Sequence, residues 1–273
     1  MGLGALVDAQ AITLGNAGNY AVFAATSIAS SGLTVIGPKI GTSPGTTITG
    51  FTLLQLGLNG GQDQNNAAAK AAATDLKALY NTLAGLTPNS SPTGLLGGVL
   101  STLTPGVYKY PTGTQLIGAL TFDGQGNANS VFVIQVGGDF NILAAASVLF
   151  INGARPCNVY YQVAGNANLV AAAVFNGNLI ASGSITANTG STILLGGGLY
   201  SVNGGVSLFV SIIDPIGIGA CGAGVAAAPQ ILTTTATVVT TATVQVTLAP
   251  QTITLPASTI TASGVTVVCT RFR

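Results

Sequence analysis

Short apolar runs alternate with turn-forming residues over the first part of the chain. The β-prone runs at residues 20–23 and 33–36 are separated from later ones by the turn signals at residues 37–38 and 43–45. Short runs of β-branched and aromatic residues bounded by Gly and Pro are typical of strands. The pattern predicts short strands joined by tight corners before residue 61.

The period of the apolar positions changes between residues 62 and 85. Apolar residues recur there at three- and four-residue spacing, as on one face of an amphipathic helix. These residues are Ala69, Ala72, Ala73, Leu76, Leu79, Tyr80 and Leu83. Gly85, followed by Pro88, supplies a stop signal. We expect one long helix over about residues 62–85, and its small alanine-rich face predicts close packing along a flat neighbour.

From residue 106 to residue 213 short strands return at a spacing of roughly 20 residues, with Gly- and Asn-rich turns between them. The strand-like runs are residues 131–136, 159–163, 178–180 and 198–202. In a parallel β-solenoid, rungs stack at about 4.8 Å, so inward positions favour small and branched apolar residues and corners favour Gly or Asn. We therefore predict a mainly β chain built as a solenoid. A β-sandwich is the competing fold, but its outward positions would carry more charge.

The composition shifts after Cys221. Residues 222–229 have the composition of a linker, and a Thr-rich segment follows in which β-branched residues alternate with period two, a strand signature. The threonines on one face of this tail are Thr233, Thr235, Thr237, Thr241, Thr243 and Thr247. Uncharged strand edges favour pairing, either with a neighbouring molecule or over the open end of the chain's own solenoid. We divide the chain into an arm (1–10), a solenoid (11–221) and a linker with a β tail (222–273).

Charge is scarce throughout the 273 residues: 5% of them are charged, against roughly 25% in ordinary soluble domains. The chain has no His and no Glu, and its Asp residues are scattered singly. It therefore lacks the residues needed for a Ser–His–Asp triad, a close carboxylate pair or a His-containing zinc site. We predict no enzyme activity, no catalytic residue, no cofactor and no metal site. A net charge of +1 also argues against nucleic acid or an anionic membrane surface as a partner, and no stretch has the composition of a membrane-spanning helix.

Cys157, Cys221 and Cys269 are too far apart for a metal knuckle or a CxxC pair. They allow one internal disulfide, and the pairing is left open. A remaining thiol is either buried or links two chains. Residues 1–8 lack the basic region of a signal peptide, so the localisation stays unassigned between an extracellular site and an assembled particle.

Several ordered motifs resemble the ice-binding proteins that fold as a discontinuous right-handed β-solenoid with one long helix alongside. The motifs are residues 14–23 (LGNAGNYAVF), 41–51 (GTSPGTTITGF), 103–108 (LTPGVY), 121–136, 152–163 and 175–186. The resemblance extends from about residue 12 to about residue 215 and implies that fold. It also implies a flat solenoid face that carries Thr, Ser and Ala in outward-facing pairs. Candidates for such an ice face in the body are Thr47, Thr49, Ser184 and Thr186.

Two functions fit these observations. We favour a non-catalytic structural protein, a self-assembling subunit of a fibre, filament, virion coat or sheath whose tail pairs with copies of itself, because low charge and a mean hydropathy of +0.62 favour self-association. The alternative is an ice-binding or antifreeze protein that adsorbs to ice, or to ordered water, through a flat Thr/Ser/Ala face. That function needs neither charge nor a catalytic group.

Overall fold

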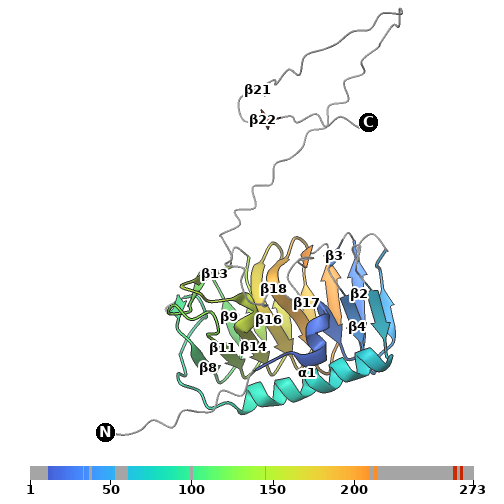
Figure 1. Ribbon diagram of the computed structural model, residues 1–273, viewed down its shortest axis with the longest axis horizontal. Helices are drawn as coiled ribbons and strands as arrows, with labels where there is room; N and C mark the ends of the chain where they lie inside the picture. The colour runs from blue at the N-terminus through green and yellow to red at the C-terminus, as the bar shows by residue number, and fades with distance from the viewer. Residues whose placement is uncertain are drawn as a thin grey trace, which may run out of the picture. The chain divides into compact units, whose positions relative to one another are not determined.

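The body of the chain is a solenoid of parallel β-strands crossed by one α-helix (Figure 1). The computed structural model describes residues 12–32, 34–36, 39–52, 61–98, 101–144, 146–209 and 212–213, together with 261–262 and 265–266. The chain divides into the unit Met1–Pro229, which contains the solenoid, and a second unit, Gln230–Arg273. The predicted mainly β solenoid with a long helix alongside is confirmed.

The side of the solenoid that faces the helix is a ten-stranded sheet, called sheet A. Its main path runs β6 (Gly61–Gln64), β4 (Lys39–Thr42), β1 (Val22–Ala24), β18 (Thr192–Ser201), β16 (Val174–Ala181), β14 (Val159–Val163), β11 (Phe132–Val136) and β8 (Gly106–Tyr110). Two short strands lie off this path: β20 (Ile212–Ile213) pairs with the first residues of β18, and β3 (Val35–Ile36) pairs with β20. Because β1 pairs with β18, the chain enters mid-solenoid, builds one end with β4 and β6, and crosses along the helix to the other end. It then returns rung by rung from β8.

Two further sheets form the other sides of the coil. Sheet B has seven parallel strands in the order β5 (Thr47–Thr49), β2 (Ser27–Ser31), β19 (Val206–Phe209), β17 (Ile185–Ala187), β15 (Ala167–Leu169), β12 (Phe140–Ile142) and β9 (Thr114–Leu116). Sheet C has three, in the order β13 (Ser147–Ile151), β10 (Ala119–Asp123) and β7 (Thr102–Leu103). In the second unit, β21 (Thr261–Ala262) and β22 (Val265–Thr266) form an antiparallel pair.

Aliphatic side chains fill most of the interior, and a cluster of aromatic rings fills one part of it. Tyr161 packs against Phe140 and Phe175 with ring centroids 5.6 and 4.7 Å apart, and Phe122 packs edge-to-face on Phe132 at 4.9 Å. Phe132 and Tyr161 are fully buried. These rings are therefore part of the core packing.

The helix, α1 (Ala67–Gly85), begins five residues later than the apolar period suggested. Residues 61–64 form β6 instead, where their backbone groups pair with β4. Asn66 then starts the helix, because its side-chain oxygen accepts a hydrogen bond from the Ala69 amide at 2.9 Å and so satisfies one of the free N–H groups of the first turn. The boundary of about residue 62 is thus corrected to Ala67.

One face of α1 packs on the outside of sheet A, as its alanine-rich stripe predicted. The buried helix residues are Ala69, Ala72, Leu76, Leu79 and Leu83, and they share a cluster with Phe23, Tyr160, Ile180 and Tyr200 of the sheet. Small side chains allow the helix axis to approach the strands closely. Sheet A is therefore covered by the chain itself.

Polar side chains hold the helix at both ends. At its start, Asp63 accepts hydrogen bonds from Tyr20 (2.7 Å) and Asn66 (2.6 Å) and forms an ion pair with Lys39 (2.7 Å). Burial by itself would raise the pKa of Asp63, but the hydrogen bonds from Lys39, Tyr20 and Asn66 outweigh it and lower that pKa. At the other end, the Gln135 amide donates to the carbonyl oxygens of the last turn, at Leu83 (2.7 Å) and Leu86 (2.9 Å).

Candidate functional site

The charged side chains of the described residues lie apart from one another, except at the Lys39–Asp63 ion pair. Within the described ranges, no three His, Cys, Asp or Glu side chains lie close enough together to hold a metal ion. Among the described charged residues Asp63 is the most withdrawn from solvent, with its side chain 11% exposed, and its partners hold the helix in place. The described part of the chain also contains no helix long and apolar enough to cross a membrane.

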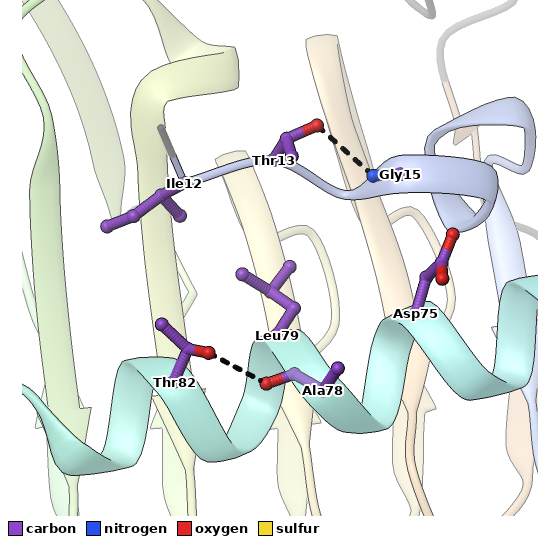
Figure 2. A pocket seen from close by; sticks show the side chains of 7 residues that line it. All are labelled: Ile12, Thr13, Gly15, Asp75, Ala78, Leu79 and Thr82. Atoms are coloured by element: carbon purple, nitrogen blue, oxygen red, sulfur yellow. Dashed lines mark hydrogen bonds between the residues drawn. The ribbon is translucent and has the colours of Figure 1, made fainter. Parts of the chain in front are cut away.

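A groove of about 330 Å³ lies between α1 and the segment that precedes the short helix η1 (Gly15–Asn19) (Figure 2). Its polar groups already have partners within the chain. Asp75 accepts hydrogen bonds from the backbone and side chain of Asn16 at 2.7 and 2.8 Å, and Thr82 donates to the Ala78 carbonyl at 3.0 Å. The groove is therefore a gap beside a helix contact and offers no concentration of free polar groups.

The three sides of the solenoid differ in what they present to solvent. Sheet A lies under α1. Sheet C exposes large apolar side chains, Leu149 (51% exposed) and Ile151 (43%), and carries the carboxylate of Asp123. Sheet B carries uncharged side chains on the outward positions of its strands, most of them short, although Phe209 at the end of β19 is 39% exposed.

Alternation along each strand of sheet B separates inward from outward positions. In β9, β12, β15 and β17 the central residue is half-buried between two buried neighbours. In β2 and β5 the outward residues Ala29, Thr47 and Thr49 are exposed, and Ser27 is half-buried. Parallel pairing brings the central residues into one column: Gln115, Asn141, Asn168, Thr186, Ser207, Ala29 and Thr49. Neighbouring members of this column are about 4.8 Å apart, the spacing of paired strands.

A second pair of outward residues lies beside the end of the column. Thr47 pairs with Ser27, two residues before Thr49 and Ala29 respectively, so their side chains point to the same side of the sheet. Successive outward residues on a strand are about 6.6 Å apart, twice the rise per residue. The outward face of β2 and β5 is therefore a small grid of hydroxyl and methyl groups.

Two glycines fix the position of β5. A Cβ at Gly45 would lie 1.8 Å from the Thr26 carbonyl oxygen, and a Cβ at Gly50 would lie 1.8 Å from the Ser30 carbonyl oxygen. Gly50 also has a φ of +82°, a conformation that favours glycine. These close approaches hold Thr47 and Thr49 tightly against the neighbouring rung.

A ladder of side chains lines the corner that leads into sheet B. Asp139 accepts from the Asn166 backbone amide at 2.7 Å, and Asn166 accepts from the Ser184 amide at 2.9 Å. Each side chain thus satisfies a backbone donor of the next rung, which fixes the corners relative to one another. Asp139 is the described charged residue that borders sheet B, directly before β12.

All four residues named as a candidate ice face lie on this side of the solenoid. Thr47, Thr49 and Thr186 occupy outward positions of sheet B, and exposed Ser184 immediately precedes β17. Ala29 and Ser207 lie between Thr49 and Thr186 in the column, but no pattern in the sequence singles them out. The pairing of β2 with β19 places them there, and that contact joins segments far apart in the sequence.

The remaining candidates fall mainly outside the described residues. This applies to the tail threonines Thr233, Thr235, Thr237, Thr241, Thr243 and Thr247, and to Cys221 and Cys269. Cys157 lies in the short helix η2 (Pro156–Asn158) and forms a disulfide.

Comparison with known proteins places this chain in a family. The ice-binding-like family profile matches residues 22–214, which include every described strand of the solenoid. This chain belongs to the ice-binding-like family. A protein named ice-binding protein from Nostoc sp. (strain HG1) is 38% identical over 196 residues, covering 71% of each chain. One from Leucosporidium sp. (strain AY30) is 32% identical over 215 residues, covering 70% of this chain and 81% of that one.

Solved structures agree with the family assignment. An ice-binding protein from an Antarctic biological consortium superposes with a TM-score of 0.66 at 34% identity, covering 74% of this chain and 89% of that one. An ice-binding protein from the Antarctic ascomycete Antarctomyces psychrotrophicus gives a TM-score of 0.66 at 33% identity, covering 74% of this chain and 97% of that one. The predicted membership of the ice-binding β-solenoid family is thus confirmed.

The comparisons contradict the structural role that we favoured from composition. The matched relatives and structures are named ice-binding proteins, so the self-assembling fibre, coat or sheath subunit was the wrong choice between the two functions. The physical reason is that composition counts charges without locating them. In this ice-binding-like chain the described charged residues lie on the helix, on sheets A and C or at corners, and none lies within a strand of sheet B.

Proposed function

We propose that this protein binds ice through the outward face of sheet B and has no catalytic role. The observation that carries the proposal is the in-register pairing of the sheet B strands, whose outward positions carry no charged side chain. The named relatives support the class of ligand, and the uncharged face supports the choice of surface.

The chemistry of the face suits adsorption to ordered water. Thr and Ser hydroxyls donate and accept hydrogen bonds, and the methyl groups of Thr and Ala fill the spaces between water positions without competing for them. Charged side chains would hold their own hydration shells against the ice lattice. Their absence from the strands of sheet B leaves a surface on which water can be arranged by the repeat of the strands.

The solenoid supplies the rigidity that such a surface needs. Every strand of sheet B is paired on both sides except β5 and β9 at the ends of the described sheet, and its inward residues are packed in the main core. A protein surface that is already rigid loses less conformational entropy when it binds to ordered water. The rigid fold therefore lowers the free-energy cost of adsorption.

Thermal hysteresis and ice-crystal shape, measured with the purified full-length chain, test this function. We expect a gap between the melting and freezing points that increases with protein concentration, together with faceted crystals. Ordinary ice growth at high protein concentration would contradict the proposal.

A further inference from the structure

The central column of sheet B is not uniform along the solenoid. At one end its outward side chains are the amides Gln115, Asn141 and Asn168 on β9, β12 and β15. At the other end they are Thr186, Ser207, Ala29 and Thr49 on β17, β19, β2 and β5. We call these the amide half and the hydroxyl half, and we include Ser27 and Thr47 in the second.

Resting on the proposed function, we infer that the hydroxyl half is the part of sheet B that contacts ice, and that the amide half is dispensable. The side chains of the hydroxyl half are short, and those of Thr are β-branched with few rotamers. Ala has no rotamer freedom to lose, whereas a Gln side chain loses much of its rotamer freedom when it is ordered. A surface of Thr, Ser and Ala is therefore closer to its bound state before ice arrives.

Hydrogen bonds within the protein distinguish the halves further. In the amide half, Asn188 donates to the Asn168 side-chain oxygen at 2.8 Å, so that oxygen already has a partner. Asp139 is exposed directly before β12 and places a negative charge at the edge of the same half. In the hydroxyl half, no described charged residue lies in the strands or immediately beside them.

The hydroxyl half is assembled from two distant parts of the chain. Ser27–Ser31 and Thr47–Thr49 come from the N-terminal strands, while Ile185–Ala187 and Val206–Phe209 come from the last rungs. They meet where β2 pairs with β19, with Ala29 opposite Ser207. The ice-contacting patch thus spans the point at which the chain closes its own solenoid, and it forms only when that pairing forms.

A matched pair of full-length variants tests the inference. Ala29→Tyr and Asn141→Tyr each place one bulky ring at a central outward position of a sheet B strand, in the same column. We expect Ala29→Tyr to lose most of the thermal hysteresis and Asn141→Tyr to keep most of it, with both variants unfolding near the wild-type temperature. If Ala29→Tyr unfolds early, Ser207→Tyr at the paired position replaces it.

The other outcomes of this experiment separate a failure of the division into halves from a failure of the proposed function. Equal losses in both variants, or a loss confined to Asn141→Tyr, would overturn the division into halves and leave sheet B as the ice-binding side. Full activity in both variants, beside an active wild type, would overturn the division and the choice of sheet B together. A wild-type protein without thermal hysteresis would overturn the proposed function itself.

Discussion

Tyr161 is fully buried among aromatic rings, and among the described residues its hydroxyl has no hydrogen-bond partner. Burial raises the pKa of this phenol well above its ordinary value, so it stays neutral. Tyr200 is buried to a similar degree, but its hydroxyl donates to the Tyr20 carbonyl at 2.9 Å. The two tyrosines therefore differ in whether the buried hydroxyl has a hydrogen-bond partner, and substituting each in turn measures the effect of that difference on stability.

We expect Tyr161→Phe to raise the free energy of unfolding by about 1 kcal/mol, because a desolvated hydroxyl without a partner is removed. Tyr200→Phe should lower it by about 1 kcal/mol, because a hydrogen bond is lost. Urea unfolding of both variants and the wild type measures the difference. A loss of stability in Tyr161→Phe as large as that in Tyr200→Phe would contradict this account of the core.

Among the elements, α1 is held at its start by Asp63 and its partners Lys39, Tyr20 and Asn66. The pKa of Asp63 is lowered from 3.8 in the folded protein, although burial opposes the shift, because Lys39, Tyr20 and Asn66 favour the carboxylate. A depressed folded-state pKa contributes stability above the unfolded-state pKa, and this contribution is lost as the pH falls through the folded-state value. The anchor of the helix should therefore weaken in acid.

We expect Asp63→Asn to be less stable than wild type at pH 7, and the difference between them to shrink as the pH falls below about 4. The reason is that protonation removes from the wild type the charge that the substitution has already removed. Unfolding curves of the two proteins at several pH values provide the measurement. A difference that stays constant down to about pH 2 would show that the carboxylate charge does not hold the helix.

Sequence periodicity predicted the elements better than their ends or their partners. The buried stripe from Ala69 to Leu83 follows the apolar spacing that predicted the helix. Its start was misplaced because residues 61–64 are polar and carry no apolar period, so only pairing with β4 shows that they form a strand. Likewise, Thr47 and Thr186 stood out as Thr-containing runs, whereas Ala29 and Ser207 gain their place only through the β2–β19 pairing.

For the whole molecule, the low charge has a different meaning from the one that composition suggested. A chain with 5% charged residues resembles a self-associating subunit as long as the positions of its charges are unknown. In the folded body the helix covers sheet A, and the strands of sheet B carry no charge. In the proposed function, this uncharged surface is the one that contacts ice.

The proposal that sheet B contacts ice is tested by the partition of fluorescently labelled full-length protein between growing ice and the remaining liquid. Thr186→Tyr, in the sheet B column, is compared with Thr121→Tyr, which changes a half-buried threonine of sheet C in the same way. We expect wild type and Thr121→Tyr to enter the ice, while Thr186→Tyr largely stays in the liquid. Exclusion of the wild type from ice, or exclusion of Thr121→Tyr but not Thr186→Tyr, would contradict it.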